Sequence, residues 1–322
     1  MFNKCLLLLS LFSTCINSAH IGSHLNKERE EDGSFVSRDH NHYGQGGEHN
    51  TDFDHEAILG SVKEAEEFEH LSPEESKKRL RLLLKNMDLN KDNNIDRKEL
   101  QAWILRSFRM LSVEESNSRF EDADENTDGL VDWDEHLKET YGTEDADDID
   151  VTNLGDDEMV KQDKMIFNAA DGDKNGVLDK TEYQSFSAPE EHPHMFPILI
   201  KQVLEEKDTD KDGFLSFQEF MGDRGQKHNR QYIVEEKDKF DNEYDTNKDG
   251  LLNENEILSW IVPSNEDIAE EEVNHLFAAS DDDHDDLLSF DEIVEHHDVF
   301  VGSEATDFGD HLTNPHLIKE EL

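Results

Sequence analysis

Residues 208–219 read DTDKDGFLSFQE, and the pattern of this stretch is the main indication of the fold. Oxygen-bearing side chains stand at its positions 1, 3, 5, 9 and 12, position 7 offers a backbone carbonyl, and position 6 is glycine. This is the ligand spacing of an EF-hand calcium loop, in which the closing glutamate grips the ion through both carboxylate oxygens. Glycine suits the sharp turn because it has no Cβ to clash at positive φ. The predicted Ca²⁺ ligands are Asp208, Asp210, Asp212, Phe214 (by its carbonyl), Ser216 and Glu219.

The pattern recurs five more times, and we number the loops 1 to 6 in chain order, with 208–219 as loop 4. Loops 2, 3 and 5 also have glycine at position 6, whereas loops 1 and 6 have Asn93 and Asp286, which tolerate a left-handed backbone less well. Loop 5 offers only three carboxylates, so we expect weaker binding there. The predicted ligands are Asp88, Asn90, Asp92, Asn94, Asp96 and Glu99 in loop 1; Asp124, Asn126, Asp128, Leu130, Asp132 and Glu135 in loop 2; Asp171, Asp173, Asn175, Val177, Asp179 and Glu182 in loop 3; Asp245, Asn247, Asp249, Leu251, Asn253 and Glu256 in loop 5; and Asp281, Asp283, Asp285, Leu287, Ser289 and Glu292 in loop 6.

The spacing of the loops predicts how they pair. Successive loops start 36 or 37 residues apart, except that loop 3 starts 47 residues after loop 2. EF-hands pair through a short strand at position 8, which is β-branched or leucine in every loop. We therefore predict an all-α fold of six helix-loop-helix units in three paired modules, joining loop 1 to 2, 3 to 4 and 5 to 6. Helical spacing predicts that Trp103, Phe167, Phe220, Trp260, Phe277 and Ile293 pack between the helices.

Shifts in composition predict the remaining boundaries. The apolar run CLLLLSLF at 5–12 is too short to span a bilayer and is typical of a cleaved signal peptide, with cleavage after Ala19 or, alternatively, after Cys15. Both cysteines then leave with the signal. The predicted order is a signal peptide over 1–19, a disordered histidine-rich segment over 20–56, EF-hands 1 and 2 over 57–142, an acidic linker over 143–157, EF-hands 3 and 4 over 158–221, a linker over 222–230, EF-hands 5 and 6 over 231–300, and a tail over 301–322.

The histidine-rich segment admits two interpretations. Clustered imidazoles are ligands for zinc or copper. A solvated linker is the interpretation we prefer, because no fixed helical spacing holds the rings on one face. The histidines concerned are His40, His42, His49 and His55.

The charge of the chain narrows the classes of partner. It has 80 Asp and Glu against 31 Lys and Arg, a formal net charge of −49. This charge argues against nucleic acid or an anionic membrane as partner, and it predicts self-repulsion that bound calcium relieves. We also expect no enzymatic activity, because the sequence lacks a mature cysteine and the common signatures of hydrolases, nucleotide-binding loops and zinc proteases.

Three segments outside the loops resemble the reticulocalbin and calumenin family, the six-EF-hand proteins of the secretory pathway. They are LSPEESKKRL at 71–80, SWIVPSNEDIAEEEVNHL at 259–276 and FVGSEATDFGD at 300–310. The resemblance covers roughly residues 71–310 and implies low-affinity calcium binding, contacts with client or regulatory proteins, and no enzymatic activity.

The last four residues, KEEL at 319–322, differ from the KDEL retention signal by one methylene. With the signal peptide they predict residence in the lumen of the endoplasmic reticulum, with secretion as the alternative. The leading functional prediction is calcium buffering with calcium-coupled folding and up to six ions. The alternative is a calcium-dependent chaperone-like or regulatory adaptor for lumenal clients.

Overall fold

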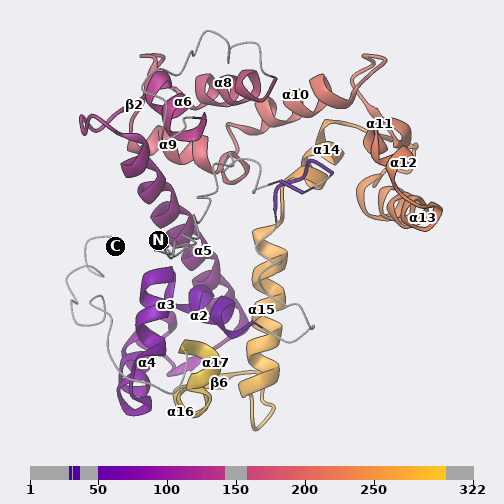
Figure 1. Cartoon of the computed structure of the whole chain (residues 1–322). Coiled ribbons are helices and arrows are strands. Elements are labelled where there is room, and N and C mark those ends of the chain that lie inside the picture. The colour runs from indigo at the N-terminus through magenta and orange to yellow at the C-terminus, as the bar shows by residue number, and fades with distance from the viewer. Residues whose placement is uncertain (1–28, 31, 37–49, 142–157, 302–322) are drawn as a thin grey trace, which may run out of the picture.

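The computed structural model describes residues 29–30, 32–36, 50–141 and 158–301. Within these ranges the chain consists of helices, tight loops and six strands of two residues each. Figure 1 shows three groups of elements, with the long helix α5 running from the lower group to the group above it. The predicted all-α fold built from EF-hands is confirmed.

The elements follow one another in this order: α2 (Thr51–Leu59), α3 (Val62–Glu69), α4 (Pro73–Met87), β1 (Asn94–Ile95), α5 (Arg97–Ala123), β2 (Val131–Asp132), α6 (Trp133–Tyr141), α8 (Glu158–Ala170), β3 (Val177–Leu178), α9 (Lys180–Ser187), the 3₁₀ turn η2 (Pro189–Glu191), α10 (Phe196–Lys207), β4 (Leu215–Ser216), α11 (Phe217–Met221), α12 (Arg224–Lys227), α13 (Arg230–Lys239), the π-helical turn η3 (Phe240–Tyr244), β5 (Leu251–Leu252), α14 (Glu254–Ile261), α15 (Asn265–Ser280), β6 (Leu288–Ser289), α16 (Phe290–Glu295) and α17 (His297–Val301).

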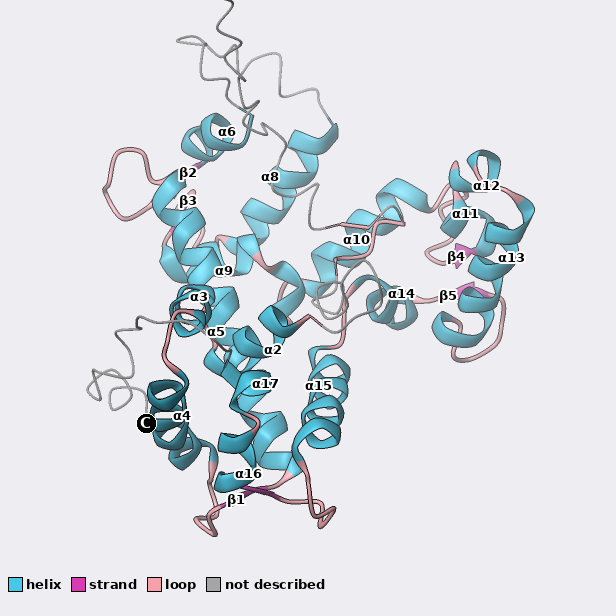
Figure 2. Cartoon of the chain, turned by 60° about the horizontal axis from the view of Figure 1, so that its bottom comes forward, coloured by secondary structure: helices cyan, strands magenta, loops and turns pink. Residues whose placement is uncertain are grey.

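The strands reveal a pairing that differs from the prediction. Strand β1 pairs with β6, β2 with β3, and β4 with β5, all antiparallel. Figure 2 shows β2 beside β3 and β4 beside β5. The predicted pairing of loops 1 with 2, 3 with 4 and 5 with 6 is therefore wrong. We call the observed units module 1/6, module 2/3 and module 4/5.

The length of α5 explains why loops 1 and 2 do not pair. This helix is the exiting helix of loop 1 and the entering helix of loop 2 in one unbroken rod of 27 residues. At 1.5 Å per residue it is about 40 Å long, so it holds the two loops far apart. Loop 1 then finds its partner in loop 6, and loop 2 in loop 3.

The predicted boundaries at 143–157 and 222–230 separate EF-hands that pair in the structure. The first range connects α6 to α8 within module 2/3 and lies outside the described residues. The second range contains α12 and lies between β4 and β5 of module 4/5. Composition alone misled here, because a polar stretch inside a module resembles a linker between modules.

Each module has its own apolar core. The side chains at position 8 of the loops are fully buried at the centre of each pair, as with Leu215 and Leu252. Among the side chains predicted to pack between helices, Trp103 is partly buried and the others are buried: Phe167, Phe220, Trp260, Phe277 and Ile293.

The N-terminal part of the described chain contributes to two of these cores. Order was predicted to begin near Ala57, but α2 begins at Thr51, because the Asn50 side chain accepts a hydrogen bond from the Asp52 N–H (3.3 Å). Phe53 is buried in module 1/6. Residues 29–30 and 32–36 lie against module 4/5, in indigo beside α14 in Figure 1. The rest of the predicted disordered segment lies outside the described residues.

Several other predictions fall outside the described residues, namely the signal peptide at 1–19 and, from residue 302 on, the tail with KEEL. The same holds for His40, His42 and His49. The fourth histidine of that group, His55, lies in α2, is buried, and has its Nε2 3.0 Å from the Asp298 carbonyl oxygen. None of the helices in the described ranges combines the length and hydropathy needed to cross a bilayer.

Candidate metal centres

All six loops have the same backbone path. At position 4 the φ angle lies between 57° and 64° in every loop. At position 6 it is 81° to 89° at the glycines of loops 2 to 5, and 66° and 64° at Asn93 and Asp286. The two irregular loops therefore adopt the left-handed turn that glycine makes easy, at a conformational cost that glycine avoids.

In each loop the first carboxylate points inward to the loop backbone. In loop 4, Asp208 Oδ2 accepts a hydrogen bond from the Gly213 N–H (3.0 Å), and Oδ1 accepts one from the Lys211 N–H (2.6 Å). The bond from position 6 to the carboxylate at position 1 is present in all six loops, at 2.8 to 3.2 Å. The first ligand is thus held in place by the turn that follows it.

The closing glutamate is held just as regularly. In loop 4, Glu219 Oε2 accepts from the Ser216 N–H (3.0 Å), and Oε1 accepts from the Thr209 N–H (3.0 Å). The bond from position 9 to the glutamate at position 12 is present in all six loops, at 2.9 to 3.1 Å. The carboxylate of the position 12 glutamate therefore points back into its own loop, as a ligand to a central ion must.

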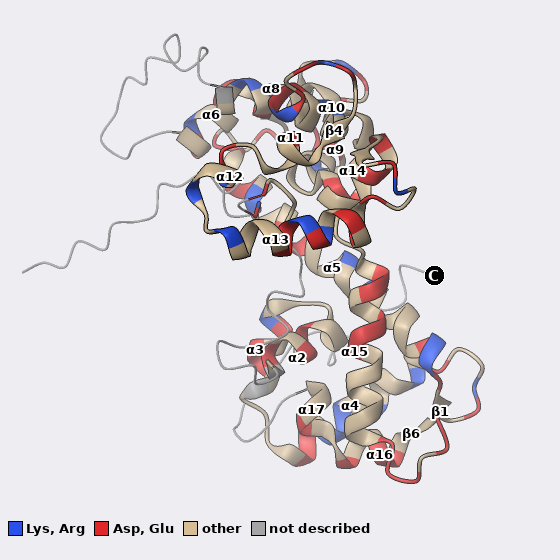
Figure 3. Ribbon diagram, turned by 90° about the vertical axis from the view of Figure 1, so that its right-hand side faces the viewer, with Lys and Arg blue, Asp and Glu red and all other residues tan. Residues whose placement is uncertain are grey.

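In three of the loops the carboxylates converge closely. One carboxylate oxygen from each of three residues lies within 4.8 Å of the others in loop 3 (Asp171, Asp173, Glu182), in loop 4 (Asp208, Asp210, Glu219) and in loop 6 (Asp281, Asp283, Asp285). In Figure 3, acidic positions mark α16 and the loop beside β1 and β6. In these three loops the structure thus brings three of the predicted ligands to one place.

Burial differs systematically along the loops. The position 1 carboxylate is buried in loops 1, 2, 3 and 5 and half-buried in loops 4 and 6, whereas the side chains at positions 3 and 5 are exposed in every loop. A cation bound there would enter from the solvent past the exposed side chains at positions 3 and 5. The less exposed carboxylate at position 1 would hold it from the protein side.

The electrostatics of loop 4 are those of a crowded anionic site. Partial burial of the Glu219 carboxylate would raise its pKa, but hydrogen bonds from Ser216 and Thr209 lower that pKa to about 2. The pKa of Asp210 is raised by desolvation and by the neighbouring Asp212 carboxylate. Glu219 is therefore fixed as an anion, while its neighbours repel one another in a way that a divalent cation relieves.

The donor set fits calcium. Carboxylate, amide, hydroxyl and carbonyl oxygens are hard ligands that suit Ca²⁺ and not a soft metal. In loop 6, Asp281 Oδ1 is buried and has no hydrogen-bond partner within the described part of the chain. A buried carboxylate oxygen without a partner is costly, and a bound cation would satisfy it.

The residue at position 9 has a second role that the ligand pattern did not predict. Its side chain caps the exiting helix and forms a capping box with the glutamate at position 12 in all six loops, at Asp96, Asp132, Asp179, Ser216, Asn253 and Ser289. The signal was present in the sequence as a small polar residue followed three residues later by Glu. Loop closure and helix initiation therefore share the same two side chains.

Comparison with known proteins agrees with this geometry. The family described as EF hand matches residues 80–105, 163–187 and 200–222, and the family described as EF-hand domain pair matches residues 237–296. These matches include loops 1, 3, 4, 5 and 6. The domain pair covers loops 5 and 6, which are consecutive in sequence but belong to different modules.

Three relatives are similar to this chain over most of its length. The chain is 40% identical over 285 residues to Reticulocalbin-2 of Crotalus adamanteus, covering 86% of this chain and 93% of that protein. It is 37% identical to Reticulocalbin-2 of Mus musculus and 38% identical to that of Rattus norvegicus, in each case over 87% of this chain and 90% of the relative. The chain therefore belongs to the reticulocalbin and calumenin family, the calcium-binding EF-hand proteins of the secretory pathway.

Proposed function

We propose that this protein is a low-affinity calcium buffer of the endoplasmic reticulum lumen, that it binds up to six ions, and that it has no enzymatic role. The observation that supports the proposal is the repeated pair of hydrogen bonds, from position 6 to position 1 and from position 9 to position 12, in all six loops. It gives loops 1 and 6 the geometry of the glycine-containing loops.

Calcium binding is coupled to folding in this proposal. The ligands at positions 9 and 12 also start the exiting helix, so an ion that orders the loop orders the helix start. The chain carries a formal net charge of −49, and each bound ion offsets two of these charges. In a calcium-rich compartment, dissociation constants on the order of 10⁻⁴ to 10⁻³ M suffice, as in extracellular EF-hand modules.

A calcium titration of residues 20–322, followed by native mass spectrometry and far-UV circular dichroism, tests the proposal. We expect stepwise binding up to six ions, accompanied by a gain of helix. Glu219→Gln removes a closing ligand and loses one ion, while the adjacent non-ligand change Gln218→Ala loses none. Absence of binding and of helix gain at millimolar calcium would refute both the buffering and the coupling.

The location in the endoplasmic reticulum is tested separately. Deletion of residues 319–322 is expected to convert a retained protein into a secreted one, and Glu320→Asp, which creates KDEL, is expected to retain it at least as well. Equal secretion with and without the last four residues would favour the extracellular alternative.

A second candidate function is a calcium-dependent adaptor for lumenal client proteins. One observation favours it: the apolar surface of module 4/5 accommodates a separate part of the chain, residues 29–30 and 32–36. Calcium-dependent capture of lumenal proteins and a calcium-dependent rise in apolar-dye binding are expected for an adaptor. A simple buffer shows neither.

A further inference from the structure

Residues 29–30 and 32–36 belong to a compact turn. Arg29 and Phe35 form an antiparallel bridge, and the Glu30 N–H donates to the Ser34 carbonyl (2.8 Å). Gly33 has a φ of 97°, and the Arg29 Nη1 donates to its carbonyl (2.9 Å). The segment is therefore held in one shape by its own hydrogen bonds, and this lowers the entropy lost when it docks.

The apolar end of this turn is built into module 4/5. Phe35 is only 4% exposed and belongs to the same buried cluster as Leu199 of α10 and Trp260 of α14. Its N–H donates to the carbonyl of Ile261, the last residue of α14 (2.9 Å). Phe35 thus fills a core position and also satisfies a carbonyl at the open end of a helix.

The first residue of the turn adds a cationic contact. The Arg29 guanidinium carbon lies 4.3 Å from the centroid of the Phe35 ring, and Nη2 donates to Gln202 Oε1 of α10 (3.3 Å). A cation suits this position because the protein as a whole is strongly acidic.

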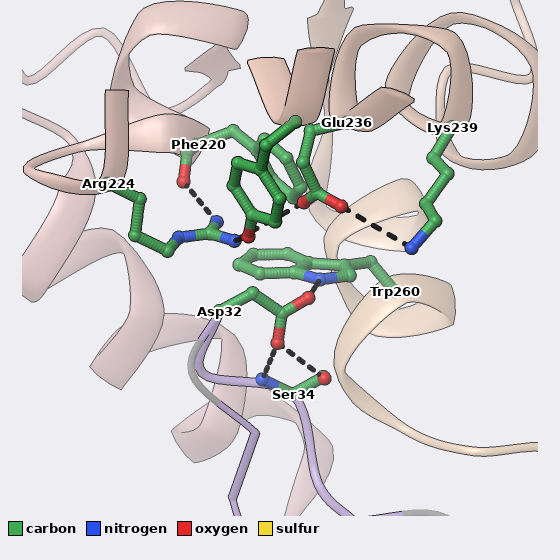
Figure 4. A network of polar contacts seen from close by, with 8 residues as sticks. Asp32, Ser34, Phe220, Arg224, Glu236, Lys239 and Trp260 are labelled. Atoms are coloured by element: carbon green, nitrogen blue, oxygen red, sulfur yellow. Dashed lines mark hydrogen bonds and ion pairs between the residues drawn. The ribbon is translucent and has the colours of Figure 1, made fainter. Parts of the chain in front are cut away.

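The polar end of the turn is anchored on Trp260. The Trp260 Nε1–H donates to Asp32 Oδ2 (2.9 Å), while the Ser34 N–H and Oγ donate to Asp32 Oδ1 (2.9 and 2.6 Å). Figure 4 shows this carboxylate between Ser34 and the indole. Burial would raise the pKa of Asp32, but these hydrogen bonds and the charge of Arg224 hold it below its usual value.

The protein side of this contact is an ion network within module 4/5. Arg224 is 6% exposed, donates to the Phe220 carbonyl (2.9 Å) and pairs with Glu236 (3.3 Å), which Lys239 also contacts (3.3 Å). Figure 4 shows this ion network on the other side of the Trp260 ring from Asp32. The indole therefore lies between this ion network and the docked turn.

A buried aromatic anchor, a backbone hydrogen bond to an open helix end and a carboxylate on an indole N–H are together the features of a bound peptide. We propose that the surface of α10 and α14 in module 4/5 is a peptide-binding site that residues 29–30 and 32–36 occupy in cis. The site accepts protein segments that carry a carboxylate, with a cationic residue three positions before that carboxylate and an aromatic residue three positions after it. Arg29, Asp32 and Phe35 have this spacing. Such a partner binds only by displacing the internal segment.

Peptide binding in trans tests this proposal directly. A fluorescent peptide of residues 27–37 is titrated into residues 20–322 and into residues 37–322, and binding is followed by anisotropy. A tethered segment competes at an effective concentration in the millimolar range. We therefore expect saturable binding to 37–322 and binding at least ~10-fold weaker to 20–322. No binding to a helical 37–322 chain, or equal binding to both chains, would overturn the proposal.

The chemistry of recognition is tested by matched peptides and variants. Asp32→Asn and Phe35→Ala peptides are expected to bind 37–322 at least ~10-fold more weakly, as is usual for anchor residues, and a scrambled peptide is expected not to bind. Trp260→Phe in 37–322 keeps an aromatic ring but removes the indole N–H, so it should abolish the preference for Asp over Asn at position 32. Retention of that preference would overturn the assignment of Asp32 to Trp260.

The intact chain provides a version of the experiment without truncation. Phe35→Ala in residues 20–322 is expected to free the site, so that the wild-type peptide binds. Val234→Ala removes an exposed side chain on α13 of the same module, 60% exposed, and is the matched control that leaves the site closed. Calcium stoichiometry is measured in parallel, so failure of peptide binding is distinguished from failure of calcium binding.

Discussion

Module 1/6 and module 4/5 are each built from two paired EF-hand loops, but the loops of one are far apart in the sequence and those of the other are adjacent. In module 4/5 the two loops start 37 residues apart, whereas in module 1/6 they start 193 residues apart. Both pairs are centred on fully buried position 8 side chains, Ile95 with Leu288 and Leu215 with Leu252. This difference shows that the loop motif specifies a short strand that must pair. The geometry of the connecting helices specifies which strand it pairs with.

The two modules also differ in how their loops turn. Module 4/5 has glycine at both position 6 residues, whereas module 1/6 has Asn93 and Asp286. Asp286 Oδ1 accepts from the Arg97 Nε (2.6 Å), and the Arg97 guanidinium lies 4.2 Å from the Phe277 ring centroid. The irregular loop 6 is thus tied to the start of α5, which no reading of consecutive residues predicts.

Buried charge is a third difference. In module 1/6, Asp54 of α2 and Glu272 of α15 are 1% and 0% exposed, and His275 Nε2 lies 3.6 Å from Asp54 Oδ2. Burial raises the pKa of Asp54 to about 7, the Glu272 charge adds to the shift, and His275 opposes it. Module 1/6 therefore contains a proton-dependent contact between α2 and α15.

The largest effect is expected from separating the two halves of module 1/6. A fragment of residues 50–141 contains loops 1 and 2 without their partners, so we expect it to lose most of its helix. Addition of residues 263–301, which carry loop 6, is expected to restore helix, as measured by circular dichroism in calcium. A fragment 50–141 that unfolds cooperatively on its own would contradict the observed pairing.

Calcium affinity gives the next largest effect. Glu219→Gln is expected to weaken loop 4 by about tenfold or more, roughly 1.4 kcal/mol, and to weaken its partner loop 5 by a smaller factor. The matched change Glu99→Gln is expected to weaken loops 1 and 6 and to spare loop 2. Site-resolved calcium titration by NMR checks both. Weakening of loop 3 by Glu219→Gln would instead support consecutive pairing.

A moderate effect is expected from pH. The folded-state pKa of Asp54 lies above its ordinary value of 3.8, so the folded state holds a proton that unfolding releases between about pH 4 and pH 7. This contribution to stability is full below pH 4 and is lost as pH rises through 7. The pKa of His55 is lowered by burial, so its contribution has the opposite dependence.

Comparison of the wild type with Asp54→Asn isolates the contribution of Asp54. The free energy of unfolding of the wild type, relative to the variant, is expected to fall from pH 5 to pH 7.5 in urea titrations at saturating calcium. Glu236→Gln in module 4/5 is the comparison variant, because Glu236 pairs with Arg224 and lies outside the Asp54 cluster. A pH-independent difference between wild type and Asp54→Asn would contradict the raised pKa.

The smallest effect concerns position 6. Asn93→Gly removes a left-handed non-glycine residue and is expected to raise the free energy of unfolding by up to ~1 kcal/mol. The reciprocal change Gly213→Asn in module 4/5 is expected to lower it by a similar amount, because a Cβ there meets no atom within 4 Å and the cost is only conformational. Urea denaturation in calcium measures both. Equal signs for the two changes would show that position 6 does not distinguish the modules.

The six calcium loops could be located from local sequence alone. Ligand type, ligand order and the turn at position 6 are fixed within twelve residues, so Asp208 and Glu219 were identifiable without any tertiary information. The same local logic placed Asn93 and Asp286 in left-handed turns, and the structure has them there. The assignment of each loop oxygen to a bound ion stays a prediction until ions are counted.

The pairing of the loops, in contrast, depends on how the helices pack in three dimensions. The partner of loop 1 depends on the unbroken length of α5, and a sequence with regular loop spacing gives no sign that two loops 193 residues apart meet. The docking of Phe35 and Asp32 on module 4/5 was missed as well, since a short, largely polar segment without apolar periodicity resembles a linker. Contacts between residues far apart in sequence depend on the placement of rigid helices, and local residue patterns do not encode that placement.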